Sequence, residues 1–180
     1  MVRYENNNRL SLKRLFMVDV TGIGEKNGDN YGPYMIDWET FETCKGPKKD
    51  NCGQFEVTNV QNMSDIIFLL DFHKDCPTTM GKIVVSTRSK NVTKRLWNYV
   101  LNRPCEHFVL GPILISSFNL TKECKIYKGK YEIHLDLEAK TKVFLGENFF
   151  YGNYTFLITS YNKVNNFFCY KTNMAVKKIA

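Results

Sequence analysis

The chain lacks the residue patterns that mark most enzymes and metal sites. It holds three histidines and six cysteines in 180 residues, but no C-x-x-C pair, no H-E-x-x-H motif and no G-x-S-x-G motif occurs. Zinc sites, redox dithiols, zincin proteases and serine hydrolases normally need one of these spacings. The sequence therefore predicts no catalytic activity and no metal site.

Long apolar runs are also missing. The segment from Leu10 to Val20 is interrupted by Lys13, Arg14 and Asp19, so it fits neither a membrane helix nor a signal-peptide core. We expect a secreted chain whose signal peptide has been removed. Residues 1–32 are polar and rich in Gly and Asn, which predicts an N-terminal arm or edge strand before one domain at residues 33–180.

Positive charge is in excess but is not concentrated. The net charge is +7, and the Lys and Arg residues are scattered along the sequence without a recognition helix or an aromatic RNA-binding motif. Nucleic acid is therefore not an expected partner. An anionic membrane or cell surface suits dispersed positive charge better, and the charge is equally well explained by solubility alone.

The cysteine count indicates an oxidising compartment. Six cysteines without short metal-type spacing favour three disulfides over buried free thiols, although these residues alone do not select a pairing. N-x-[ST] sequons give weak additional support for a secreted glycoprotein. They lie at Asn62, Asn91, Asn119 and Asn153.

Aromatic residues make up 14% of the chain, which favours β structure. After Pro33, short strand-like runs alternate with turn residues and no solenoid-type repeat is present. Seven strands are expected, at Tyr34–Thr43, Gln54–Val60, Asp65–Phe72, Lys82–Thr87, Lys130–Glu138, Asn153–Tyr161 and Asn166–Val176.

Two of these strands and one irregular segment carry specific expectations. Strict alternation after Lys130 predicts a surface strand with one buried face. Asp65–Phe72 is apolar on both faces, which predicts a central strand covered on each side. Residues 92–118 contain prolines and aromatics without a regular period, which predicts a short helix or an irregular loop.

The C-terminal half carries spaced motifs that resemble a known family. The motifs are Cys124-x-x-x-x-Gly129-x-Tyr131, Gly152-Asn153-Tyr154, Cys169-x-Lys171 and Lys177-x-Ile179, with a thinner match at Trp38-x-x-Phe41-x-x-Cys44. This pattern resembles the ganglioside activator protein family, an ML-like group of lipid-recognition proteins, and its insect relatives of the chemosensory-B and moth promoting-protein types.

The resemblance implies a mainly β fold in which two antiparallel sheets form a cup or sandwich around an apolar cavity. Such proteins bind or present lipids without chemistry of their own. The family arrangement implies disulfides between Cys44 and Cys169 and between Cys105 and Cys124, which leaves Cys52 to pair with Cys76. This chain has six cysteines where the mammalian pattern has eight.

The candidate ligand-binding residues follow from the inward faces of three expected strands. Four further aromatic or aliphatic residues in the irregular segment either line the mouth of the cavity or simply close one end of the core. The strand residues are Ile66, Phe68, Leu70, Tyr131, Ile133, Leu135, Tyr154, Phe156 and Ile158, and the segment residues are Trp97, Leu101, Phe108 and Ile113.

Two functions remain open at this point. The first is a secreted, non-enzymatic protein that binds, transfers or presents a lipid or small apolar ligand. The second is a secreted β-sandwich that acts on a cell-surface partner and whose core is filled by its own side chains. We expect no cofactor other than a bound lipid or fatty acid, and the sequence does not decide the oligomeric state.

Overall fold

The computed structural model describes residues 30–60, 65–89 and 92–179. Residues 31–180 form one compact unit. The sequon residues Asn62 and Asn91 and residues 1–29 of the expected arm lie outside the described residues. The first strand begins at Tyr31.

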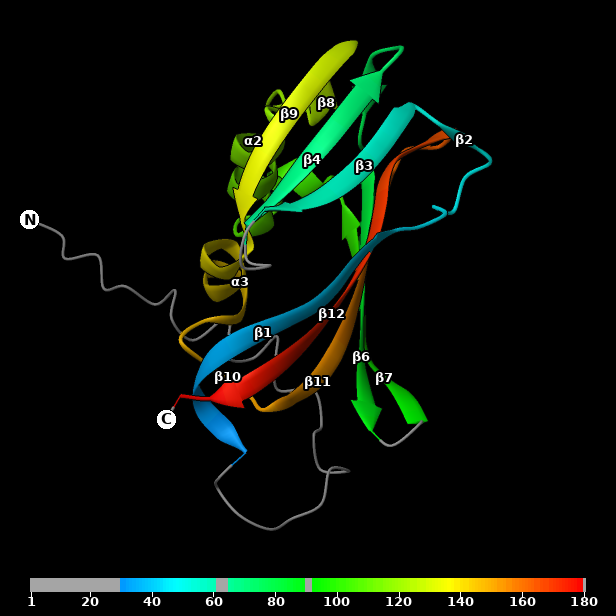
Figure 1. Cartoon of the computed structure of the whole chain (residues 1–180). Coiled ribbons are helices and arrows are strands. Elements are labelled where there is room, and N and C mark those ends of the chain that lie inside the picture. The colour runs from blue at the N-terminus through cyan, green and yellow to red at the C-terminus, as the bar shows by residue number, and fades with distance from the viewer. Residues whose placement is uncertain (1–29, 61–64, 90–91, 180) are drawn as a thin grey trace, which may run out of the picture. The chain divides into compact units, whose positions relative to one another are not determined.

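A large, mostly antiparallel sheet forms one layer. Its order is β10-β1-β12-β11-β6-β7, and the short β2 pairs in parallel with β12. In Figure 1 the long strand β12 runs from the β2 end to the β10 end of this sheet. The strands are β1 (Tyr31–Thr43), β2 (Asp50–Asn51), β6 (Met80–Ser89), β7 (Val92–Asn102), β10 (Asn148–Phe150), β11 (Gly152–Tyr161) and β12 (Asn165–Lys178).

A smaller antiparallel sheet, β3-β4-β9, forms a second layer (Figure 1). Its register places Phe68 between Val57 and Ile133, so inward apolar side chains of neighbouring strands lie in one row. A minor ladder joins β5 and β8. The strands are β3 (Gly53–Val60), β4 (Asp65–Phe72), β5 (Cys76–Pro77), β8 (Lys125–Ile126) and β9 (Gly129–Asp136).

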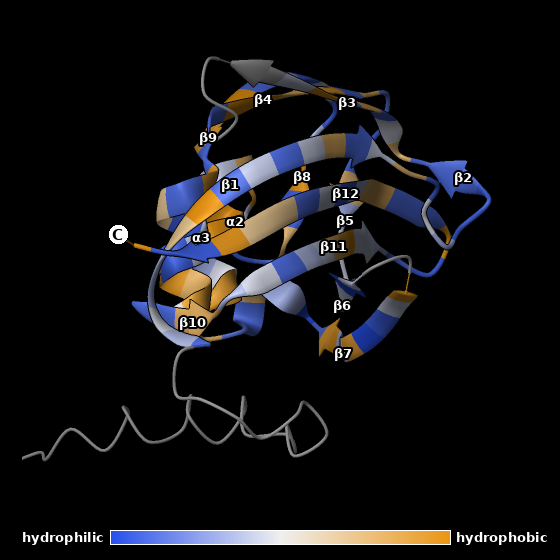
Figure 2. Ribbon diagram, turned by 60° about the horizontal axis from the view of Figure 1, so that its bottom comes forward, coloured by the Kyte–Doolittle hydropathy of each residue, from blue (hydrophilic) through white to orange (hydrophobic). Residues whose placement is uncertain are grey.

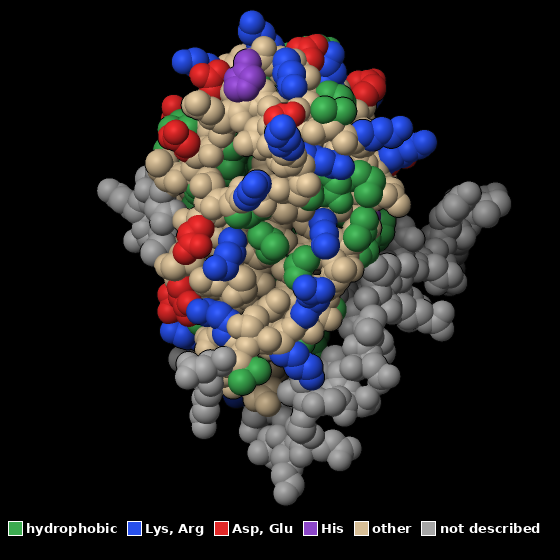
Figure 3. Space-filling model, turned by 90° about the vertical axis from the view of Figure 1, so that its right-hand side faces the viewer, with side chains coloured by type: hydrophobic (Ala, Val, Ile, Leu, Met, Phe, Trp, Pro, Cys, Tyr) green, Lys and Arg blue, Asp and Glu red, His purple; other side chains and the backbone are tan. Residues whose placement is uncertain are grey.

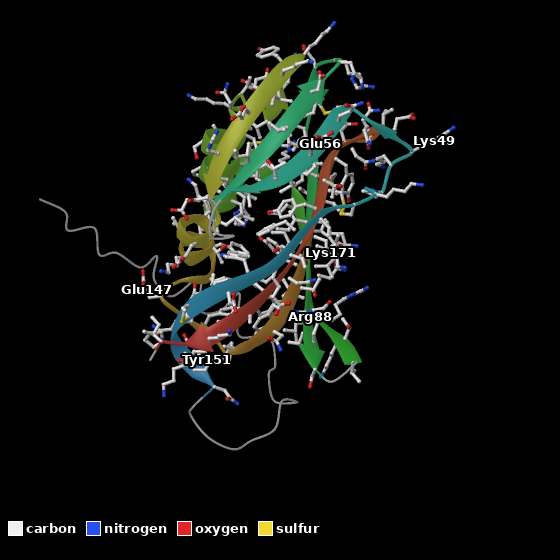
Figure 4. The ribbon with its side chains drawn as sticks, viewed as in Figure 1. Lys49, Glu56, Arg88, Glu147, Tyr151 and Lys171 are labelled. Atoms are coloured by element: carbon white, nitrogen blue, oxygen red, sulfur yellow. A yellow bond between two sulfur atoms is a disulfide. The ribbon has the colours of Figure 1, made fainter. Side chains whose placement is uncertain are left out.

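Aromatic side chains join the two sheets at the β3–β4 end. Phe55 stacks on Phe168 of β12 with ring centroids 5.7 Å apart, and Phe72 stacks on Phe167 at 5.2 Å. Figure 4 shows side chains filling the space between β3–β4–β9 and β12. Aromatic side chains therefore close this end of the sandwich.

Two short helices, α2 (Leu110–Phe118) and α3 (Leu137–Leu145), complete the unit and lie on one side of the large sheet (Figure 2). A single 3-10 turn, η1 (Pro104–Glu106), precedes α2. The helix α2 ends at Asn119, whose left-handed backbone (φ 49°) is the conformation that terminates many helices.

The expected fold class is confirmed, because the described chain is mainly β, with two antiparallel sheets, and all seven expected strands are present. The expectation for residues 92–118 was wrong in its first part. Val92–Asn102 is the strand β7, paired with β6 from end to end. Because β7 is a mostly exposed edge strand, it buries no regular face and shows no hydrophobic period.

The expected strand Lys130–Glu138 extends two residues too far. The Asp136 carboxylate accepts a hydrogen bond from the Ala139 N–H at 2.8 Å and so caps α3. β4 is central in its sheet, as expected, but it is not covered on both faces. Leu69 is 38% exposed on the outer face between Glu56 and Glu132.

All three disulfides that the resemblance implies are present. Cys44 joins Cys169 across β1 and β12, and Cys105 joins η1 to Cys124 before β8. The remaining bridge links Cys52, just before β3, to Cys76, just after β4. The described cysteines include no free thiol.

Candidate functional site

An apolar cavity of about 150 Å³ lies between the large sheet and the two helices. Its sheet side is formed largely by the inward row of β12 and by β11, because alternate residues of a strand share one face. Phe156 and Ile158 of β11 lie beside Tyr170, Thr172 and Met174 of β12.

The helix side of the cavity follows from helical spacing. Residues three and four apart share a helix face, and both short helices turn such a face toward the cavity. From α2 this face is Leu110, Ile113, Leu114, Ser117 and Phe118, and from α3 it is Leu137, Lys140, Thr141 and Phe144.

Five of the thirteen predicted ligand-binding residues line this cavity: Leu101, Ile113, Leu135, Phe156 and Ile158. They come from β7, α2, β9 and β11, so the structure brings together residues from both sheets and from the irregular segment. Their contact with a ligand stays a prediction.

The other eight lie outside the cavity lining, for different reasons. Ile66, Phe68 and Leu70 are buried in the closed part of the core, and Tyr131 and Ile133 pack against that core from the edge strand β9. Tyr154 and Trp97 both contact the Phe149 ring instead. Phe108 is 63% exposed and stacks on His107.

Sequence reasoning missed the polar members of the lining. Trp38 was noted only as part of a cysteine-anchored motif, and Thr172 and Ser117 were not singled out. A period-two or helical pattern selects apolar faces, so isolated polar residues on those faces escape it. The available signal was a Thr and a Ser at inward positions, between apolar residues of the same face.

These three polar residues are buried without hydrogen-bond partners. Trp38 Nε1, Ser117 Oγ and Thr172 Oγ1 have no partner, and their residues are only 6%, 9% and 4% exposed. Most buried polar atoms in folded proteins are hydrogen-bonded, and each exception costs about 1–3 kcal/mol. Because three such atoms belong to residues that line one cavity, we include them in the candidate site.

The deep part of the site is electrically neutral. Burial raises the pKa of the Tyr170 phenol above its usual range, so this side chain stays uncharged at physiological pH. Lys82 and Lys140 are the lining lysines, and both are partly exposed. The described residues contain no cluster of His, Cys, Asp or Glu that could hold a metal ion.

His107 has a structural position at the start of α2. Its Nδ1 accepts hydrogen bonds from the N–H groups of Val109 (3.3 Å) and Leu110 (3.1 Å), so its proton resides on Nε2, which donates to the Tyr99 hydroxyl at 2.8 Å. Burial lowers the pKa of His107. Its sequence neighbour Glu106 pairs with Arg103 rather than with the imidazole.

The described surface shows no concentrated basic region on the face in Figure 3, where Lys and Arg side chains are spread from one end to the other. Several cations are paired with acids on the outer face of the large sheet, including Lys171 with Glu42 and Arg88 with Glu39. No described helix is long and apolar enough to cross a membrane.

Comparison with known proteins gives a limited result. No family model matches the chain, and no curated protein matches it. Among solved structures, it is similar to chicken MD-1 complexed with lipid IVa, at 14% identity and a TM-score of 0.36, over 82% of this chain and 99% of that one. This similarity by itself assigns neither a ligand nor a partner.

Proposed function

We propose that the chain is a secreted, non-enzymatic protein that binds a lipid or a small apolar ligand for transfer or presentation. The observation that carries this proposal is the apolar cavity between the large sheet, α2 and α3. An apolar guest gains free energy as its surface leaves water, about 25 cal/mol for each Å² buried. The cavity offers such a guest apolar walls from several elements.

The size of the cavity sets what it accepts without rearrangement. Ligand pockets usually measure about 300–1,000 Å³, whereas this cavity measures about 150 Å³. A small apolar molecule fits it directly. A lipid chain needs more volume than this cavity offers, and each methylene that is buried contributes about 0.8 kcal/mol.

Secretion is supported by the disulfides and by two described sequons. Three disulfides without a free described cysteine are typical of oxidising compartments. Asn119 and Asn153 are both exposed, so a glycan could be attached to either without disturbing the core.

The alternative function is that of a secreted interaction module. The closed aromatic end of the core and the small cavity volume favour it, because such a protein needs no guest. In that case the dispersed positive charge would meet an acidic cell-surface partner.

The two functions are separated by measuring ligand uptake. Protein secreted from a eukaryotic host is extracted with organic solvent for mass spectrometry, and purified protein is titrated with a fluorescent apolar dye in competition with fatty acids. Saturable binding supports the carrier. No bound lipid and no saturable binding of any apolar compound would favour the interaction module.

A matched pair of variants locates the binding site. Leu114→Trp fills the cavity from α2, and we expect it to weaken binding about tenfold, since overpacking costs about 1–3 kcal/mol. Ser116→Trp adds the same side chain to the exposed side of the same helix and should leave affinity unchanged. Equal affinities in the two variants would place the ligand elsewhere.

A further inference from the structure

Three of the four buried side-chain atoms without a partner in the described chain belong to residues that line one cavity. Two come from the large sheet, Trp38 on β1 and Thr172 on β12, and the third, Ser117, comes from α2. An otherwise apolar cavity with donors on both sides is suited to a guest that is apolar but not purely hydrocarbon.

Trp38 is the most informative of the three. An indole N–H can only donate, and Trp38 is nearly fully buried with its ring 5.4 Å from that of Phe41. A hydroxyl rotates to find a nearby carbonyl, as Ser116 does by donating to the Ile113 oxygen. The Trp38 N–H is fixed in the plane of the indole ring and cannot rotate toward a nearby backbone carbonyl. Its acceptor must therefore come from another group, such as a guest in the cavity.

The two sheet residues are close neighbours. Trp38 pairs with Met174 across β1 and β12, and Thr172 is the next residue on the same face of β12. Diagonal neighbours of this kind are within reach of a single small group. The Trp38 N–H and the Thr172 hydroxyl therefore belong to neighbouring residues of the lining, and both are open to a guest in the same cavity.

We infer that the cavity takes a small neutral molecule of about benzene to acetophenone size that carries a hydrogen-bond acceptor such as a ketone, ester or ether oxygen, with Trp38 as the donor. This inference rests on the proposed function and narrows its ligand class. The volume of about 150 Å³ sets the size, and the orphan donors set the chemistry. A neutral acceptor suits the donors better than an anion does, because Trp38 and Thr172 are buried whereas the lining lysines, Lys82 and Lys140, are partly exposed.

The test uses two probes of similar size, acetophenone and isopropylbenzene, in which a methyl group on an sp³ carbon takes the place of the carbonyl oxygen. Affinities are measured by calorimetry for the wild-type chain, Trp38→Phe and Trp97→Phe. We expect Trp38→Phe to weaken acetophenone binding about three- to tenfold and to leave isopropylbenzene binding within twofold, as for the loss of one neutral hydrogen bond. Trp97 lies outside the lining, so Trp97→Phe should leave the ratio of the two affinities unchanged.

A second measurement keeps the inference testable should Trp38→Phe fail to fold. The chain has two tryptophans, so ¹⁵N-indole labelling gives two N–H signals, and the Trp97→Phe variant assigns the one from Trp38. Acetophenone should move this signal downfield, and isopropylbenzene should not. An unmoved signal, with acetophenone bound, would overturn the inference.

The remaining outcomes separate this inference from the proposed function. If both probes lose affinity equally in Trp38→Phe, or if only long-chain fatty acids bind, the small-acceptor inference fails while the carrier function stands. If no apolar compound binds at all, the carrier function itself fails, and this inference fails with it.

Discussion

The Nδ1 atom of His107 accepts a hydrogen bond from the N–H of Leu110 at 3.1 Å, which places a titratable side chain at the start of the helix that lines the cavity. The first N–H groups of a helix have no partner within the helix, and the imidazole supplies one. Protonation of Nδ1 would remove this acceptor and bring a positive charge to the positive end of α2.

We therefore expect stability to fall as the pH drops below about 6.5, the ordinary pKa of histidine. Burial lowers the pKa of His107 in the folded chain, so the unfolded chain binds more protons between the two pKa values. The stability that neutral His107 contributes is complete above its pKa in the unfolded chain. It is lost as the pH falls through its pKa in the folded chain. Urea unfolding between pH 7.5 and about pH 5 measures it.

Matched histidine variants isolate this effect. His107→Asn keeps a neutral acceptor and should flatten this part of the pH dependence, and His73→Asn, which removes an exposed histidine just after β4, is the matched control. The nearby Arg103 and Glu106 pair with each other, so Glu106→Gln provides a further control. An unchanged pH slope in His107→Asn would contradict the assignment.

The disulfides should differ in their contribution to stability. The Cys44–Cys169 bridge closes a separation of 125 residues and the Cys105–Cys124 bridge one of 19. On the chain-entropy model, removing the first by double Ala substitution costs about 5 kcal/mol and removing the second about 3 kcal/mol. Non-reducing peptide mapping checks the pairing, and finding Cys169 free or joined to Cys124 would contradict it.

Two buried threonines should respond in opposite ways to loss of the hydroxyl. Thr172 has no partner, whereas the Thr78 hydroxyl lies 2.9 Å from that of Ser160, with both residues buried. Thr172→Val should leave the ligand-free chain as stable or up to about 1 kcal/mol more stable, and Thr78→Val should cost about 1–3 kcal/mol because Ser160 loses its partner. Chemical unfolding of both variants measures the change in free energy of unfolding. A loss of stability in Thr172→Val as large as that in Thr78→Val would show that the Thr172 hydroxyl has a partner.

The strand pattern could be predicted from sequence because alternation is local. The row Tyr131, Ile133 and Leu135 was assigned to an inward face, and all three side chains contact the core. Alternation gives no information about the distance between the two sheets. Phe68 of β4 meets the Tyr170 ring of β12 directly, so the inward row of β4 is packed in the core and does not line the cavity.

The polar residues of the site and the strand β7 were missed for related reasons. β7 is an edge strand that buries few residues, so it leaves no hydrophobic period to detect. Ser117 and Thr172 occupy single inward positions whose burial depends on tertiary packing. The motif that contains Trp38 did indicate an important position, although its role as a buried donor needed the structure.

The last prediction concerns Phe68, which forms part of the wall behind the cavity. This side chain is fully buried on β4, and its ring lies 5.5 Å from that of Phe118 and 5.8 Å from that of Tyr170, two residues of the lining. Phe68→Ala should cost about 3–5 kcal/mol and leave space directly behind the lining.

We expect the enlarged cavity to bind a longer ligand, such as a medium-chain methyl ketone, more tightly than the wild type does. Saturating ligand should then raise the melting temperature of the variant by more than that of the wild type, because binding to the folded state adds to stability. Phe72→Ala is the matched control, since Phe72 is almost equally buried on the same strand but its ring contacts Phe167 and Tyr131, neither of which lines the cavity. It should lose similar stability without any gain in ligand response, and equal recovery by both variants would mean that the cavity does not extend toward Phe68.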